Sequence, residues 1–417
     1  MDAPSQSNQM QALVGALGSV IGYLGSEVAE KVLFERLMWP QRYYNDLTFS
    51  IFLKQGFLMT MGGPLHAAAL ATLDVFRDSG LYKGTRRGHM LGTAFLPSTN
   101  VTNFLRTDSD SRGIAKQSRN GFWVQVLKNI KDVPVKEHVP RIDRQPTNDL
   151  MHVRTRQPVH HLRFRLVSDI EPPGEHVICI SEERTTLNVV LGIFLSELSA
   201  VISAVVAGAR MRDWWLVPYL CIPLILKLLS VLVNVRRSGL ESYLELQRSG
   251  SLSDSVVIEV QNPNHGFAVL EGPEPVIRQF FRHYGHPKRD TCGDRVREVF
   301  SILLIYLFVL IFPVGLVANL WMSTEVQYLW LAYQLYAILA MHIVRIFGWE
   351  GCGRTEERVA GHLRDKMEVW LYSTGGCTVG VNLRTTYVDQ IKAGETMVQE
   401  IVRKHRPHDV LKSHATV

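Results

Sequence analysis

Long apolar runs dominate the second half of the chain. Four windows stand out, each of 22 residues: Leu187–Gly208, Trp214–Val235, Val299–Leu320 and Val326–Phe347. A helix needs about 20 residues to cross the roughly 30 Å hydrocarbon core of a bilayer, so each window is long enough to span it. Only Glu197, Lys227 and Arg345 are charged within the windows. The pattern therefore predicts four transmembrane helices arranged as two hairpins.

Basic residues near the ends of the windows predict their orientation, because Lys and Arg collect on the cytosolic side of a membrane. One side carries Arg184, Arg236, Arg237, Arg295, Arg297, Arg345 and Arg354. The opposite side carries Arg210 and Arg212 in the first short turn and no basic residue in the second, Ser323–Glu325. We therefore expect both termini and the 236–298 loop to be cytosolic.

Two apolar stretches in the first 76 residues are harder to place. Ala12–Gly25 is too short to span and carries glycines every three or four residues, a spacing typical of close helix contact. Gly56–Leu73 contains His66 and is broken by Gly62-Gly63-Pro64. We interpret both as membrane-associated or buried helices, and a fifth span at one of them as an alternative.

Period-two alternation predicts strands outside the apolar windows, whereas residues 80–150, rich in Gly, Ser, Asn and Asp, are expected to be largely loop. The expected strands are Leu162–Leu166, Val177–Ile180, Val256–Val260, Phe267–Leu270, Val369–Tyr372 and Thr378–Asn382. Helices are expected at Pro275–Tyr284 and Tyr387–Lys404. The turn at 262–266 makes the second pair of strands a hairpin.

None of these strand pairs is large enough to stand alone in water, because two strands bury too little apolar surface. All lie on one side of the membrane in the predicted topology, so we expect one sheet of about six strands covered by the two helices. The predicted fold class is an α-helical transmembrane bundle of four spans. Its cytosolic α+β domain is assembled from the N-terminal region, the 236–298 loop and the C-terminal tail. Along the chain, the predicted regions are an N-terminal helical region (1–76), a basic, loop-rich cytosolic region (77–186), the first transmembrane hairpin (187–235), a cytosolic loop (236–298), the second transmembrane hairpin (299–347) and the cytosolic C-terminal tail (348–417).

Charge and cysteine content narrow the function class. The net charge is +6, and residues 77–186, with 18 Lys and Arg against 12 Asp and Glu, account for all of it. A basic surface of this kind is expected to lie against the anionic cytoplasmic leaflet of a membrane. No sequence motif indicates binding to nucleic acid. The five cysteines are odd in number and lack a CxxC pair, which argues against a disulfide framework.

Glu197 and Lys227 are the most informative polar residues in the apolar windows. A charge near the bilayer centre costs about 2.5–3.5 kcal/mol, and both residues lie about 16–20 Å from the short turn that joins their helices. We expect them to form an ion pair, which would offset both costs. Such a pair either fixes the register of the helices or takes part in proton or ion movement, and the sequence leaves both open.

Pro313 is expected to kink the third span, because its ring leaves the carbonyl of Val309 without a helical donor. Gln334 lies at similar depth on the fourth span and could supply that donor. His342 lies two turns further on, on about the same face, so a polar lining of a pathway is the alternative interpretation.

No catalytic or cofactor motif is present, and no metal or cofactor is expected. His283 and His286, with Cys292 nearby, lack a fourth zinc ligand. The sequon at Asn100 faces the cytosol in the predicted topology and should stay bare. The expected partner is the lipid bilayer, with self-association or another membrane protein left open.

Three strings resemble uncharacterised multi-pass membrane proteins of filamentous fungi. They are Gln279–Pro287 (QFFRHYGHP), Phe312–Leu316 (FPVGL) and Tyr333–Tyr336 (YQLY), within a likeness covering roughly residues 255–350. The resemblance implies a membrane location in a fungal cell, at the plasma membrane or an endomembrane, and implies no activity.

The pattern favours a non-enzymatic membrane scaffold or regulator that presents a cytosolic domain. One alternative is a subunit of an oligomeric channel or transporter. Another is a membrane-embedded enzyme acting on a lipid or apolar metabolite, with Glu197, His342 or Gln334 as its polar groups.

Overall fold

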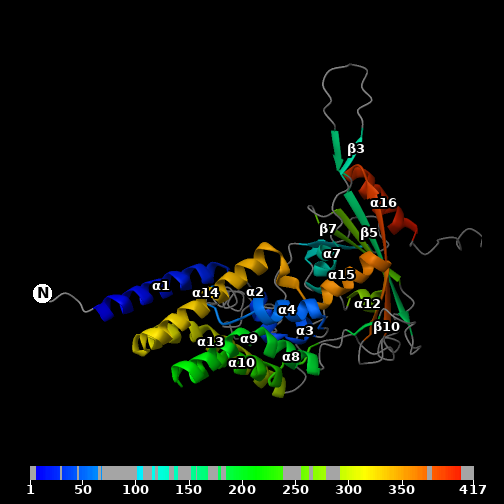
Figure 1. The fold of residues 1–417 in the computed structure, drawn as a ribbon. Helices are drawn as coiled ribbons and strands as arrows, with labels where there is room; N and C mark the ends of the chain where they lie inside the picture. Colours follow the sequence, from blue (N-terminus) through cyan, green and yellow to red (C-terminus); the bar gives the residue numbers. More distant parts are fainter. Residues whose placement is uncertain are drawn as a thin grey trace, which may run out of the picture. The chain divides into compact units, whose positions relative to one another are not determined.

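The chain folds into two compact units in a computed structural model (Figure 1). The helical unit comprises residues 1–95, 182–237 and 286–355, and the sheet unit comprises 96–181, 238–285 and 356–417. Within them the structure describes residues 6–28, 31–44, 47–63, 67, 101–106, 115–117, 121–130, 136–139, 152–155, 157–167, 177–179, 185–237, 255–262, 266–278, 292–372 and 378–404.

The helical unit contains the four predicted windows. Its α-helices are α1 (Gln6–Val28), α2 (Lys31–Met38), α3 (Gln41–Tyr44), α4 (Phe49–Leu58), α8 (Leu187–Ser196), α9 (Leu198–Val206), α10 (Leu216–Leu232), α13 (Cys292–Ala318) and α14 (Thr324–Ile346). A π-helical turn, Ala207–Met211, continues α9.

Two of the four windows form helices that are long and apolar enough to cross a membrane, namely α13 and α14. The first window is bent by 54° between α8 and α9, and it becomes a third span only if the bent pair is counted as one. The second window forms α10, which at 17 residues is shorter than a typical span. Of the four predicted spans, the two of the second hairpin therefore form helices long and apolar enough to cross a membrane, and the first two windows do not form single helices of that length.

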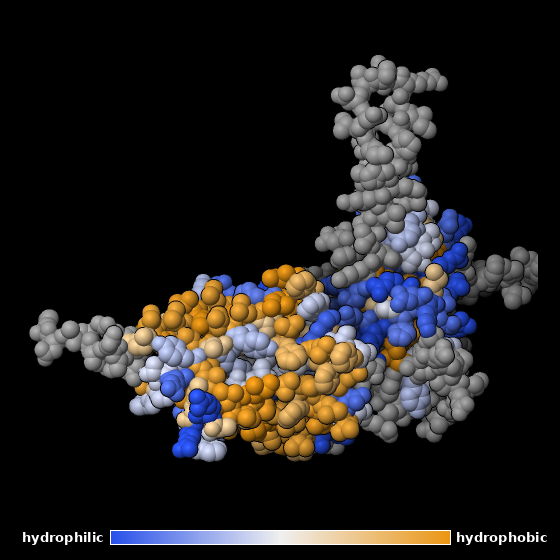
Figure 2. Space-filling model, in the orientation of Figure 1, coloured by the Kyte–Doolittle hydropathy of each residue, from blue (hydrophilic) through white to orange (hydrophobic). Residues whose placement is uncertain are grey.

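The surface of the helical unit is largely apolar, as the orange region of Figure 2 shows. On α13 the exposed apolar side chains recur every three or four residues: Val296, Val299, Phe300, Leu303, Leu307, Leu310, Val314 and Val317. The opposite face of α13 is buried, with Phe308 and Phe312 packed in the same core as Trp330 of α14. Soluble proteins rarely leave so continuous an apolar surface in water, so the helical unit is membrane-associated.

The N-terminal apolar stretches differ from their predictions. The first helix is longer than Ala12–Gly25 and extends from Gln6 to Val28. The second stretch is not a helix from Gly56 onward, because α4 ends at Leu58 and residues 59–63 are non-helical and buried. His66 lies outside the described residues.

The sheet unit is built on an eight-stranded mixed sheet in the order β2-β1-β7-β8-β5-β10-β9-β6. Its strands are β1 (Thr102–Arg106), β2 (Ala115–Gln117), β5 (Gln157–Val167), β6 (Val177–Cys179), β7 (Ser255–Asn262), β8 (Gly266–Pro273), β9 (Glu368–Tyr372) and β10 (Thr378–Val388). β5 pairs with β8 and β6 with β9 in parallel, and the remaining pairs are antiparallel. A separate two-stranded sheet joins β3 (Lys136–Val139) to β4 (His152–Thr155).

Both faces of the large sheet are covered by helices. Side chains of β5 alternate between the faces: Leu162 and Phe164 pack with residues of α7 (Gly121–Asn129), α12 (Glu274–Arg278) and α15 (Thr355–Lys366). Val159 packs on the other face with Val398 of α16 (Ile391–Lys404). This alternation is the expected consequence of a period of two along a strand.

The prediction of one composite sheet is confirmed, since strands from three chain segments pair with one another. Several details were wrong. Among the described residues the sheet has eight strands rather than about six, and the stretch 80–150, expected to be largely loop, also supplies β1, β2, β3 and α7. The last helix begins at Ile391, because residues 387–388 belong to β10. The helix expected at 275–284 is described only as far as Arg278.

Candidate functional site

The predicted ion pair between Glu197 and Lys227 is present at the centre of the helical unit. The carboxylate Oε1 of Glu197 contacts the Lys227 ammonium, and the two side chains are 0% and 2% exposed. Lys227 also donates to the Ser196 hydroxyl at 2.7 Å, and Ser196 in turn donates to the Ile193 carbonyl at 2.8 Å. The lysine therefore reaches α8 through two partners, which ties α10 to the end of that helix.

Glu197 is also the point at which the first window breaks. It caps the end of α8 and precedes α9, with φ −114° and ψ 15°, outside the helical region. The continuous helix expected over Leu187–Gly208 was therefore wrong at this residue. The break changes the direction of the helix at Glu197, the residue whose buried carboxylate needs polar partners inside the protein.

A second interrupted segment meets this break. After α4 the chain runs without helical hydrogen bonds through Met59, Thr60 and Met61, which are 1–2% exposed, and through Gly62 and Gly63. The amide of Met61 donates to Glu197 Oε1 at 3.2 Å. Non-helical backbone in an apolar interior must find partners within the protein, and the carboxylate supplies one.

This non-helical segment, residues 59–63, packs against α14. Phe57 accepts a hydrogen bond from the Tyr336 hydroxyl, and a Cβ at Gly62 would lie 2.2 Å from the Tyr333 hydroxyl. One residue later, a Cβ at Gly63 would lie 2.9 Å from Met341. The chain thus approaches α14 near its middle and turns back toward its C-terminal end. Only glycine fits against the Tyr333 ring at this turn.

Several buried polar atoms around this point make no hydrogen bond among the described residues. They are Thr60 Oγ1, Glu197 Oε2, the Tyr333 hydroxyl, and both amide atoms of Gln334. Unpartnered buried polar atoms are uncommon in native proteins. Glu197, the Met61 backbone and Tyr333 together form what we call the polar centre.

The other predicted polar residues do not behave as expected. Gln334 is fully buried and, within the described part of the chain, does not donate to Val309. α13 runs through Pro313 to Ala318 as one helix, so the proline does not end it. Instead the Tyr219 hydroxyl donates to the Ile311 carbonyl at 3.0 Å, in the same turn.

Pro313 lines an open apolar groove with a volume of about 560 Å³, together with Trp215 and Trp321. His342 is half-buried, and its Nδ1 lies 2.9 Å from the Ile338 carbonyl one turn earlier. No described contact joins Gln334, His342 or Pro313 to the ion pair, so the predicted polar pathway along α14 is not assembled by these contacts.

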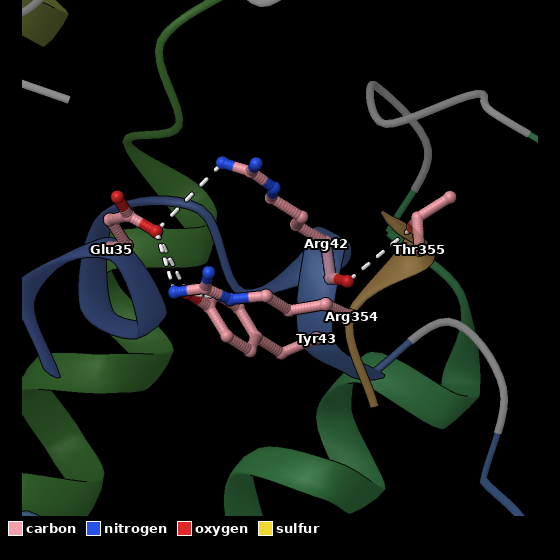
Figure 3. A network of polar contacts seen from close by, with 5 residues as sticks. All are labelled: Glu35, Arg42, Tyr43, Arg354 and Thr355. Atoms are coloured by element: carbon pink, nitrogen blue, oxygen red, sulfur yellow. Dashed lines mark hydrogen bonds and ion pairs between the residues drawn. The ribbon is translucent and has the colours of Figure 1, made fainter. Parts of the chain in front are cut away.

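A second buried polar network was missed by the sequence interpretation (Figure 3). The Glu35 carboxylate accepts from the Tyr43 hydroxyl at 2.9 Å and from Arg354 at 3.0 Å, and Arg42 lies 3.8 Å away. Arg354 also donates to the Tyr43 hydroxyl, and the Thr355 hydroxyl donates to the Arg42 carbonyl. Burial raises the pKa of the Tyr43 phenol, so it stays protonated and can donate.

This network, which we call the Glu35 network, holds the segment after α14 against α2 and α3. The guanidinium groups of Arg42 and Arg237 both lie over the Trp39 ring, at 5.1 and 4.1 Å from its centroid. The sequence did carry a signal for this network: Arg and aromatic residues alternate between Arg36 and Tyr44, and guanidinium groups stack favourably on aromatic rings. The Glu35 network lies outside the apolar windows, so the cost of a charge in the bilayer did not identify its residues.

The histidines do not assemble a metal site in the part of the chain that the structure describes. In the sheet unit, His161 Nε2 lies 2.7 Å from Glu271, and His160 Nδ1 lies 3.1 Å from the Thr385 hydroxyl. His283 and His286 lie outside the described residues. Cys221, Cys352 and the exposed Cys292 form no disulfide among the described residues.

Comparison with known proteins gives no relative for this chain: no protein-family model, no curated protein and no solved structure matches it.

Proposed function

We propose that this chain is a multi-pass membrane protein that holds the sheet unit at the cytosolic surface as a non-enzymatic scaffold or regulator. One observation carries the proposal: a single sheet is built from segments 96–181, 238–285 and 356–417, and apolar helical inserts separate these segments. The fungal membrane proteins that parts of the sequence resemble are consistent with it.

The topology follows from a parity argument. Strands that pair in one sheet must lie on the same side of a membrane, so each insert between them crosses it an even number of times. For the insert at 286–355, α13 and α14 give two crossings. For the insert at 182–237, the bent α8–α9 pair and α10 give either two crossings or none. We favour two, which yields the four predicted spans.

The side is inferred from the basic residues, since Arg236, Arg237, Arg295 and Arg354 all flank the ends from which the sheet segments emerge. This puts the sheet unit and the C-terminal tail in the cytosol. The eight-stranded sheet has its own core on each face, so it can present a binding surface without help from the lipid.

A reconstitution experiment tests the non-transporting part of the proposal. Purified protein in sealed proteoliposomes that enclose a pH-sensitive dye should leave an imposed proton gradient unchanged relative to empty liposomes. Proton or ion flux that Glu197→Gln abolishes would overturn the scaffold proposal.

The polar centre favours the channel or transporter subunit as a second candidate. An interrupted helix facing an unwound, buried segment is the arrangement by which many transporters build ion and substrate sites near the bilayer midplane. Here the α8–α9 break and residues 59–63 meet at Glu197, whose Oε2 remains available among the described residues. The flux measurement separates the two candidates.

A further inference from the structure

α1 packs along the second hairpin, which is formed by α13 and α14. A Cβ at Gly18 would lie 2.9 Å from Leu316, and one at Gly22 would lie 2.6 Å from Phe312. Residue numbers thus rise along α1 while they fall along α13, so the two helices are antiparallel. Since α13 and α14 are joined by a short turn, α1 runs in the same direction as α14 (Figure 1).

Two contacts place the ends of the N-terminal segment. Met10 Sδ accepts a hydrogen bond from the hydroxyl of Tyr328, close to the start of α14. The Arg36 guanidinium donates to the Glu350 carbonyl at 2.9 Å, four residues beyond the end of α14. Between Met10 and Arg36 the chain therefore travels the whole length of a helix that qualifies as a span.

The outward face of α1 is apolar along this path. Its exposed large apolar side chains are Met10, Leu13, Leu17, Val20, Tyr23 and Leu24, between 37% and 64% accessible, and the hydroxyl of the exposed Ser19 donates to the Gly15 carbonyl. The inward face carries Val14 and Ile21, which are buried against the bundle. The exposed stripe ends at Leu24, one turn before Glu27, the first charged residue on the helix.

The distribution of basic residues agrees with a crossing. Residues 1–30 contain neither Lys nor Arg, whereas Lys31, Arg36 and Arg42 follow the end of α1 at Val28. For a membrane segment this asymmetry puts the C-terminal end on the cytosolic side. The apolar part of α1, Ala12–Glu27, is short for a span when length and composition alone are considered.

We propose that α1 forms an additional membrane crossing, with its outward face in contact with lipid acyl chains. At about 1.5 Å per residue, α1 alone covers roughly 34 Å, and α2 completes the path to Glu350. The N-terminal end of α1 then lies on the side of the Ser323 turn, opposite to the C-terminal tail. This reverses the side expected for the N-terminus and leaves the parity of the later inserts unchanged.

Two glycosylation tags in one full-length protein test the proposal. A sequon-bearing peptide of about 20 residues is added before Met1, a different one is added after Val417, and the protein is made in microsomes. We expect the N-terminal tag to carry a glycan and the C-terminal tag to remain bare. A third variant with a sequon peptide in the Ser323 turn shows that the outward side is accessible.

The outcomes separate this inference from the proposed orientation. Tags on opposite sides support the crossing, even if the C-terminal tag is the modified one, in which case only the cytosolic placement of the sheet unit is wrong. Tags on the same side, with the Ser323-turn variant modified, overturn the crossing, because α1 must then enter and leave by one surface.

Discussion

Glu197 connects three parts of the helical unit through one carboxylate. It neutralises Lys227 of α10, accepts from the Met61 amide in the non-helical segment 59–63, and marks the bend between α8 and α9. The cost of a charge in hydrocarbon made the pair predictable from the sequence. The hydrogen bond from the Met61 amide was not predictable, because a backbone amide is free to donate to a side chain only where the chain has left a helix.

Removing one member of this pair should cost more than removing both. Glu197→Leu or Lys227→Leu strands a buried charge, for which a loss of about 3–5 kcal/mol is typical. The double substitution removes both charges, so its loss should be smaller than either single loss. Thermal unfolding of the purified protein in one detergent measures all three. Additive losses would contradict an energetic coupling between the two residues.

Gly62 is the second residue whose role is sharply defined. A Cβ there would lie 2.2 Å from the Tyr333 hydroxyl and 2.9 Å from its ring, so Gly62→Ala should destabilise the protein by about 1–3 kcal/mol. Gly15→Ala is the matched control, since nothing lies within 4 Å of that position. Equal melting temperatures for the two variants would show that the non-helical segment 59–63 does not pack against Tyr333.

Residue-scale prediction failed where the partner depended on tertiary contacts. Gln334 was expected to satisfy Val309, yet it makes no described hydrogen bond, and Tyr219 donates to Ile311 instead. The depth of a residue along a helix can be counted from the sequence. The direction in which its side chain points relative to a neighbouring helix cannot.

At the scale of elements, the uninterrupted apolar helices α13 and α14 were predicted well, because the length and charge content of the windows decide them. The bend at Glu197 and the short α10 were not, since mean hydropathy is the same for a straight span and a broken one. The strands were found where alternation is strong, as in β5, and missed in residues 80–150, where polar residues conceal β1 and β2.

The seating of α1 gives a prediction for one element. Gly22→Leu places a bulky side chain where Phe312 already lies, so it should lower the melting temperature and expose α1 to added protease in detergent. Gly15→Leu adds the same side chain on the same helix into open space and should change neither. Limited proteolysis near residue 28 reports on α1 directly. An unchanged cleavage rate in Gly22→Leu would contradict close packing of α1 on α13.

At the scale of the whole molecule, the composite sheet was predictable because two strands alone cannot be stable and topology left three pairs on one side. Its order was not predictable. β10 lies between β5 and β9, and its eleven residues pair with β5 along their full length. The tail is therefore a central part of the sheet, although it comes last in the chain.

Deletion of residues 367–417 tests that central position. It removes β9, β10 and α16, and with them Val379, Val381 and Val398 from the two cores of the sheet unit. We expect the 255–273 hairpin to lose its protection from protease, since β5 and β8 would be left without cover. Retained protection of that hairpin would mean that it folds without the tail.

The account as a whole depends on the sheet unit lying on one side of the membrane with the Ser323 turn on the other. The most direct measurement uses the natural sequon at Asn100 together with a sequon peptide inserted in the Ser323 turn of the full-length protein, made in microsomes. The account predicts one glycan, on the inserted peptide, with Asn100 bare. A glycan on Asn100, or glycans at neither site with an intact membrane-bound protein, would contradict it.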